Sequence, residues 1–207
     1  MFAAYPLVLV VFLWQDAYSP AKLVTAVSPA PSLMSVYGGE VVLNAGVDTR
    51  GNVREVRVIH GRSPFNEQAA QAVSQWTFIP AQTDQPVDSR VSATILFRPR
   101  SIFPIGPPVR LIQPSLSDEE RPPFPLAVSD PGYPVDSVAE GVVILQLQIS
   151  ADGSIQNVQV IRDVPSLTGA AEEVVRSWVF SHAKAEGRPV PGTAVVAISF
   201  LRPVVQP

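Results

Sequence analysis

The stretch Gly141–Phe200 opens with GVVILQLQISADGSIQNVQVIR and decides the fold, because an earlier stretch of the chain repeats its pattern. That earlier stretch, Gly39–Phe97, opens with GEVVLNAGVDTRGNVREVRVIH. At a constant offset of 102 residues, the turn glycines, the valine-rich runs and a later Trp-x-Phe motif coincide, and the offset grows to 103 before the last strand. Agreement over this length indicates an internal duplication, and two copies are a tandem pair rather than a solenoid. We call residues 39–97 repeat 1 and residues 141–200 repeat 2.

The two repeats predict the same order of elements. In repeat 1, apolar residues alternate from Glu40 to Asp48, which is typical of a half-buried strand. A glycine-containing turn and the strand Val53–His60 complete a hairpin. An apolar stripe at helical spacing follows and reaches Trp76, and a third alternating run ends at Phe97. The expected fold class is α+β: two tandem small domains, each a three-stranded antiparallel sheet (β-β-α-β) with a helix packed on one face.

Prolines mark the expected domain boundary. Nine of them lie between Pro99 and Pro131. Because proline is excluded from helix interiors and central strands, this composition predicts a stiff, extended linker. The expected division is an apolar segment and lead-in at 1–29, a first domain at 30–98, the Pro-rich linker at 99–129 and a second domain at 130–207.

The N-terminal residues Ala3–Trp14 form an apolar run of twelve. A membrane-spanning helix needs about 20 apolar residues, so the run is closer to the core of a signal peptide. No Lys or Arg precedes it, and Pro6 lies inside it. The alternative is a buried or disordered tail from a misplaced start codon. The first interpretation predicts a periplasmic or other cell-envelope protein, exported or anchored to the inner membrane, with membrane association through this segment.

The composition argues against several function classes. The net charge is −3 and no basic cluster occurs, so we expect no nucleic-acid partner. Cysteine is absent, and the two histidines, His60 and His182, belong to no metal-binding or catalytic motif. No nucleophile–base pair is recognisable either. We therefore expect no catalytic residues, no metal site, no cofactor and no enzymatic activity.

Aromatic residues after each helical stripe are the expected core. Trp76 and Phe78 in repeat 1 correspond to Trp178 and Phe180 in repeat 2. Tryptophan on an apolar stripe is most simply explained by packing of the helix against the sheet.

The order of these motifs resembles the TonB C-terminal domain family, in two tandem copies. In repeat 2 and the residues before it, the resemblance rests on Tyr133-Pro134, Gly141-Val142-Val143, Asp152-Gly153, Ala170-Ala171 and Trp178-Val179-Phe180. In repeat 1 it rests on Gly39-Glu40-Val41, Gly51, Ala69, the run Trp76–Ala81 and Phe97-Arg98-Pro99. Repeat 1 lacks the Tyr-Pro pair, and Pro29-Ala30-Pro31 stands roughly in its place.

The resemblance implies a TonB-like envelope protein that binds an extended peptide of an outer-membrane transporter, or of another partner, by β-strand addition. In the family members that transduce energy, an N-terminal transmembrane helix couples to a proton-driven inner-membrane complex. The alternative is a structural module of the envelope that self-associates through its sheet edges, as a homodimer or within one chain, with no role in transport.

The third strand of repeat 2 is the predicted partner-binding edge. A helix between the second and third strands of an antiparallel sheet gives the strand order 2-1-3, so strands two and three are both edges. An edge strand offers unpaired N–H and C=O groups to an extended peptide. The residues expected to bind are Val195, Val196, Ala197, Ile198, Ser199 and Phe200, whose outward side chains carry no charge. Residues 90–97 are the weaker counterpart in repeat 1.

Overall fold

The computed structural model describes residues 18–30, 37–104, 106–113 and 120–204. The apolar N-terminal run, and with it the signal-segment prediction, lies outside these residues. Repeat 1 contains β2 (Gly39–Val47), β3 (Val53–His60), α1 (Phe65–Val73) and β7 (Ser89–Phe97). Repeat 2 contains β10 (Gly141–Ile149), β11 (Ile155–Arg162), α2 (Thr168–Arg176) and β15 (Gly192–Phe200). The predicted α+β class is confirmed.

Shorter strands surround these elements. They are β1 (Lys22–Thr25), β4 (Thr77–Ile79), β5 (Ala81–Gln82), β6 (Pro86–Val87), β8 (Val109–Arg110), β9 (Pro125–Val128), β12 (Val179–Phe180), β13 (Ala183–Ala185) and β14 (Arg188–Val190). β5 pairs with β6, and β13 pairs with β14, as short hairpins before the third strand of each repeat.

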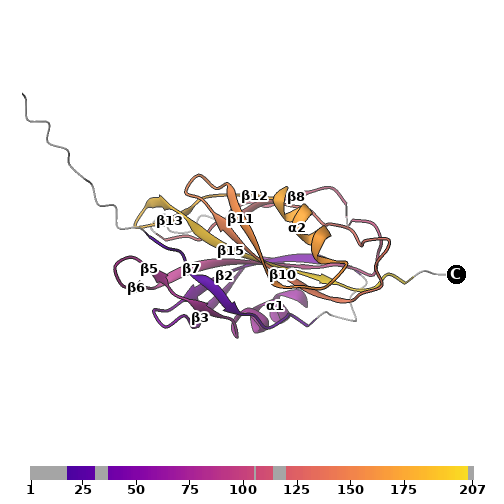
Figure 1. Ribbon diagram of the computed structural model, residues 1–207, viewed down its shortest axis with the longest axis horizontal. Coiled ribbons are helices and arrows are strands. Elements are labelled where there is room, and N and C mark those ends of the chain that lie inside the picture. The colour runs from indigo at the N-terminus through magenta and orange to yellow at the C-terminus, as the bar shows by residue number, and fades with distance from the viewer. Residues whose placement is uncertain (1–17, 31–36, 105, 114–119, 205–207) are drawn as a thin grey trace, which may run out of the picture.

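The six long strands form one continuous sheet in the order β11-β10-β15-β7-β2-β3 (Figure 1). Each repeat contributes three antiparallel strands in the predicted order 2-1-3. The two halves join where β15 and β7 pair in parallel. The boundaries expected at 30–98 and 130–207, and the independent folding of each part, stay predictions.

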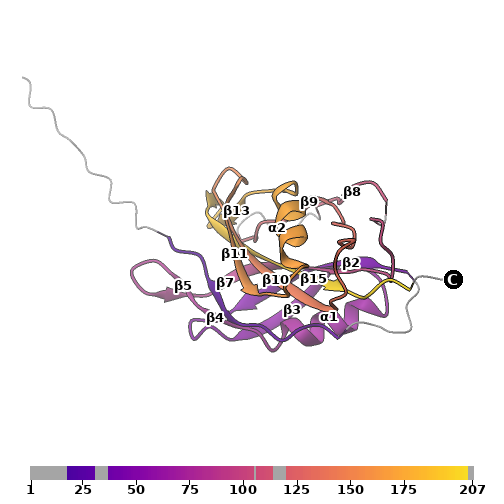
Figure 2. The same cartoon turned by 45° about the vertical axis from the view of Figure 1, so that its right-hand side comes forward.

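The two helices lie on opposite faces of this sheet, α1 below it and α2 above it in both ribbon views (Figures 1 and 2). Each face has its own apolar core, and each core takes residues from both repeats. The core on the α1 face includes Val142, Ile144, Val195 and Ala197 of repeat 2. The core on the α2 face includes Val42 and Leu96 of repeat 1. Packing therefore couples the repeats in addition to the strand pairing.

A segment preceding each repeat completes its core. β1 pairs with β4 and β9 pairs with β12. The indole N–H of Trp76 donates to the carbonyl oxygen of Val27 at 2.9 Å, and that of Trp178 donates to Ser129 at 3.1 Å. Both tryptophans are buried, as are Phe78 and Phe180.

The described part of the Pro-rich stretch is not the extended linker that its composition predicts. It contains β8 and β9, which form a three-stranded sheet with β12. Leu111, Phe124 and Val128 of this stretch are buried in the core on the α2 face. Proline is compatible with this arrangement because Pro125 is the first residue of β9, the central strand, and the first position of a strand tolerates a missing N–H.

A buried ion pair lies at the junction between the repeats. The Nε of Arg98 is 2.5 Å from Oδ1 of Asp130, and the two side chains are 0% and 5% exposed. The same guanidinium donates to the carbonyl oxygens of Ser101 and Phe103 and lies 5.4 Å from the ring centroid of Phe200. Arg98, the residue directly after β7, therefore anchors the loop that leads into repeat 2.

Candidate partner-binding edges

The strand predicted to bind a partner is not an edge. β15 pairs with β10 along its full length, from Gly192 to Phe200. Its other side pairs in parallel with β7, from Ala194 opposite Ser92 to Ser199 opposite Phe97. The prediction of an exposed edge at Val195–Phe200 is therefore wrong, and the same pairing removes the counterpart edge at 90–97. A peptide could reach these backbone groups only by displacing half of the sheet.

The physical reason lies in the side chains on both faces of β15. All nine residues of the strand are buried. Val195 and Ala197 stand beside Ala93 and Ile95 on the α1 face, while Ile198 stands beside Leu96 on the α2 face. The outward side chains are uncharged because they are covered by the chain itself.

Two buried hydrogen bonds hold the segment around β1, which precedes repeat 1, against repeat 2. The backbone N–H of Leu23 donates to Oε1 of Gln146 at 2.5 Å, and Oγ1 of Thr193 donates to the carbonyl oxygen of Ala21 at 2.5 Å. Both polar side chains are 2% exposed. The outer side of β1 is thus capped by side chains of repeat 2 and is a poor site for an added strand.

The free edges of the six-stranded sheet are β3 and β11, the second strand of each repeat. Each stands at an end of the strand order, with no further strand paired to it in the described part of the chain. Both carry register shifts at equivalent positions, between Val42 and Leu43 opposite β3, and between Ile144 and Leu145 opposite β11. A second shift lies near the start of each strand. Such bulges limit edge-to-edge pairing to the regular segment between them.

Charged side chains occupy the β3 edge. Nε of Arg54 is 2.6 Å from Oδ2 of Asp48, and Nε of Arg57 is 2.7 Å from Oε1 of Glu55. Arg90 adds a second contact to Glu55, at 3.6 Å. His60 at the end of the strand lies 3.1 Å from Glu40.

Uncharged side chains occupy most of the β11 edge. Its exposed residues are Gln156, Asn157, Gln159, Val160 and Arg162, and only the last carries a charge. The Arg162 guanidinium donates to the carbonyl oxygen of Ala26 at 3.4 Å. The two edges therefore have the same backbone shape and different chemistry.

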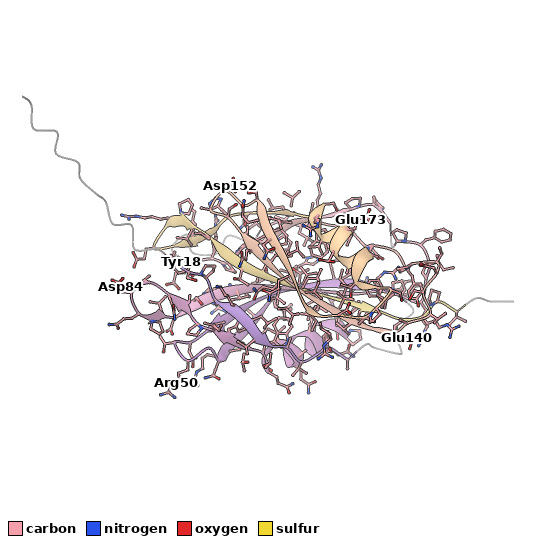
Figure 3. The ribbon with its side chains drawn as sticks, viewed as in Figure 1. Tyr18, Arg50, Asp84, Glu140, Asp152 and Glu173 are labelled. Carbon is pink, nitrogen blue, oxygen red and sulfur yellow. The ribbon has the colours of Figure 1, made fainter. Side chains whose placement is uncertain are left out.

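A carboxylate organises the hairpin turn at the start of each edge. Asp48 accepts from the backbone N–H groups of Asn52 and Arg50 and from the Arg54 side chain, which lowers its pKa to about 2. Asp152 accepts from the hydroxyls of Ser150 and Ser154 and from the Ser154 N–H, which also lowers its pKa to about 2. Figure 3 places the turn residues Arg50 and Asp152 on opposite sides of the molecule.

The turn glycines are required by geometry as well as by sequence pattern. Gly51 has φ of 84°, and a Cβ there would lie 1.8 Å from the carbonyl oxygen of Phe78. Gly153 has φ of 91°, with the carbonyl oxygen of Phe180 at 2.7 Å from such a Cβ. Each hairpin therefore packs closely on the strand that follows the helix.

Within the described residues, no group of three or more His, Asp or Glu side chains is placed to hold a metal ion. The two histidines have different neighbours: Nε2 of His182 lies 3.4 Å from Arg121, and Nε2 of His60 lies 3.1 Å from Glu40. No helix in the described ranges is long and apolar enough to span a membrane.

Comparison with known families agrees with the duplicated pattern. The family model described as Gram-negative bacterial TonB protein C-terminal matches residues 29–99 and again residues 131–201. None of the curated proteins compared with the chain matches it.

Proposed function

The chain belongs to the TonB C-terminal family, with two copies in tandem, and from this premise we propose that it binds an extended segment of a protein partner by strand addition at an outer edge of its sheet. The family is one of TonB-like envelope proteins, and its domains mediate protein interaction rather than catalysis.

The strand order carries the proposal. In the order β11-β10-β15-β7-β2-β3, four strands are paired on both sides, whereas β11 and β3 each keep one side free of strand pairing among the described residues. Unpaired N–H and C=O groups on such a side can form the hydrogen bonds of an added strand. Main-chain hydrogen bonds provide affinity, and alternating side chains provide specificity.

The partner class follows from the family. We infer that the bound segment belongs to an outer-membrane transporter and that the protein works in the periplasm, exported or anchored to the inner membrane. A role in energy-coupled transport is the furthest step of this proposal. The support for that step is the family membership alone. Because the third strands of the two repeats, β7 and β15, pair with each other, we infer that docking takes place at the second strand of a repeat, β3 or β11.

A structural module is the second candidate function. The observation in its favour is the parallel pairing of β7 with β15, which uses an edge of each repeat within the chain itself. In this alternative the remaining edges pair with a second copy of the chain, and no transporter is bound.

A peptide array separates these functions. Peptides tiled across the periplasm-exposed segments of outer-membrane transporters from the same organism are screened against the purified chain. Hydrogen exchange then locates any binding. We expect at least one peptide to bind and to slow exchange of amides in β3 or β11. Absence of binding by every peptide, together with a dimeric mass of the free chain, would favour the structural module.

A further inference from the structure

The two free edges are not equivalent, and the difference identifies the docking strand within the proposed function. Charged residues on an edge strand are a recurrent device against unwanted pairing. At β3, Glu55 and Arg57 form an ion pair in the middle of the strand. At the equivalent positions of β11, 102 residues later, stand Asn157 and Gln159. Only the β11 edge lacks charges along its regular segment.

The helix side of β11 presents a valine stripe. Val158 is paired with Leu147 and Val160 with Leu145, so both valines share the α2 face with buried leucines. Val160 is 36% exposed and Val158 is partly buried against the core. An added strand would place its apolar side chains beside these valines, because neighbouring strands align side chains on the same face.

The opposite side of β11 presents amides. Asn157 is paired with Gln148 and Gln159 with Gln146. The Gln146 Nε2 donates to Gln159 Oε1 at 3.4 Å. Gln159 is exposed, and its Nε2 can donate a hydrogen bond to an added strand. Side chains that alternate with the apolar set would therefore meet hydrogen-bonding groups without charge.

The bulges limit the length of the docking segment. Regular pairing with β10 covers the residues from Asn157 to Val160, and register shifts lie on both sides of them. Arg162, just beyond the second shift, is the single cation of the strand. It provides an attraction for a carboxylate at one end of the added peptide.

We propose that β11 is the docking edge and that it accepts an extended partner segment in which apolar side chains alternate with uncharged polar ones, with a carboxylate near Arg162. The inference rests on the proposed function of strand addition. It commits to a peptide of a different protein. A second copy of this chain is the competing occupant.

A synthetic peptide tests this assignment. The probe has about eight residues and alternates valine with threonine and glutamine, with glutamate at its N-terminus and lysine at its C-terminus, since antiparallel pairing as in β10–β11 brings its N-terminus to Arg162. Its binding to the whole chain is measured by fluorescence anisotropy. Matched variants are Val160→Lys in β11 and Val58→Lys at the equivalent position of β3, both at partly exposed valines.

We expect Val160→Lys to weaken binding at least about tenfold, because lysine protects a sheet edge, and Val58→Lys to leave it unchanged. Moving the glutamate to the C-terminus of the probe should also weaken binding. An unchanged melting temperature in both variants shows that the fold is kept.

Two results would overturn the assignment of β11, and a third would overturn the side-chain pattern proposed for its partner. If Val58→Lys weakens binding and Val160→Lys does not, β3 is the docking edge and the proposed function survives. If the probe fails to bind while array peptides slow exchange in β11, the side-chain pattern is wrong and the edge is right. If neither probe nor array binds and the chain doubles its mass unless Val160 is changed, β11 pairs with a second copy, and peptide binding itself is refuted.

Discussion

The tryptophan of each repeat donates its indole N–H to a carbonyl oxygen 49 residues earlier in the chain, in the segment that precedes the repeat: Val27 for Trp76 and Ser129 for Trp178. The hydrogen bonds of equivalent buried polar side chains in the two repeats show no such agreement. Gln146 accepts the N–H of Leu23, whereas the buried Oδ1 of the equivalent Asn44 has no hydrogen-bond partner among the described residues. At the position equivalent to Leu23 stands Pro125, which has no N–H to donate. The comparison teaches that the apolar packing scheme is shared by the repeats and that the polar groups at its outer surfaces distinguish them.

The largest expected effect tests the shared part of the comparison. Trp76→Ala and Trp178→Ala should each lower the free energy of unfolding by about 3–5 kcal/mol, because each leaves a cavity in a buried core. Since both cores contain residues of both repeats, either change should shift one unfolding transition of the whole chain. The measurement is calorimetry of the two variants. Two transitions, with only one displaced, would show that the cores unfold separately.

The buried Arg98–Asp130 ion pair at the junction should have an effect of similar size on the free energy of unfolding, and it has no equivalent in repeat 2. Arg98→Ala should cost about 3–5 kcal/mol, because it leaves the Asp130 carboxylate buried without its cation. Arg100→Ala is the matched control: its pair with Glu140 is exposed and should contribute about 0–1 kcal/mol. Urea unfolding of both variants gives the comparison. Equal losses would contradict the structural role assigned to the buried pair. The position equivalent to Arg98 in repeat 2 is Leu201, so no similar test exists there.

A smaller difference separates Gln146 from Asn44. Gln146→Met removes the acceptor of the Leu23 N–H and should cost about 1–3 kcal/mol, the penalty for an unsatisfied buried donor. Asn44→Leu removes an oxygen that has no hydrogen-bond partner within the described residues, so it should be neutral or stabilising. Thermal unfolding of the two variants decides. If Asn44→Leu destabilises the chain as much as Gln146→Met does, an unobserved partner satisfies Asn44.

The smallest expected effect is on the pH dependence of stability, and it should be the same in both repeats. The pKa values of Asp48 and Asp152 are lowered to about 2 in the folded chain. A carboxyl with a lowered folded-state pKa stabilises the fold above its unfolded value, here 3.8, and the stabilisation is lost as the pH falls toward 2. Stability should therefore decline from about pH 4 to pH 2, and Asp48→Asn with Asp152→Asn should flatten that part of the curve. An equally steep decline in the double variant would assign it to other carboxyls.

Much of the fold follows from the sequence. The alternation in Glu40–Asp48 predicts β2 almost residue for residue, and the hairpin that it forms with a second strand at Val53–His60 predicts β3. The offset of 102 residues transfers this prediction to repeat 2. The strand order 2-1-3 follows from the helix between the second and third strands and is confirmed.

The docking edge does not follow from the same reasoning, because that reasoning considers each repeat by itself. Inside a single repeat, uncharged Val195, Ala197 and Ser199 indicate an unprotected edge. A strand buried on both faces reads instead as a nearly continuous apolar run, and Ala194–Leu201 is such a run. Outward Val142 and Ile144 in the neighbouring strand give the same signal of a covered face. Applied to the true edges, the charge criterion selects β11.

The covering segments could not be predicted from composition. Proline-rich stretches are usually extended and solvated, yet Leu111, Phe124 and Val128 lie between the prolines and enter the core on the α2 face. Their placement depends on the tertiary surface they meet. The local pattern holds no periodicity that would reveal it.

The most direct test of the account asks whether the two repeats are one structural unit. A specific protease site is inserted between Gln113 and Glu120, and the cleaved protein is analysed by size-exclusion chromatography and native mass spectrometry. Because β7 and β15 pair in parallel and both cores are shared, the account predicts that the two fragments elute together as one particle with the mass of the intact chain. Two folded fragments that elute separately, each with its own mass, would contradict it and restore β15 as a free edge.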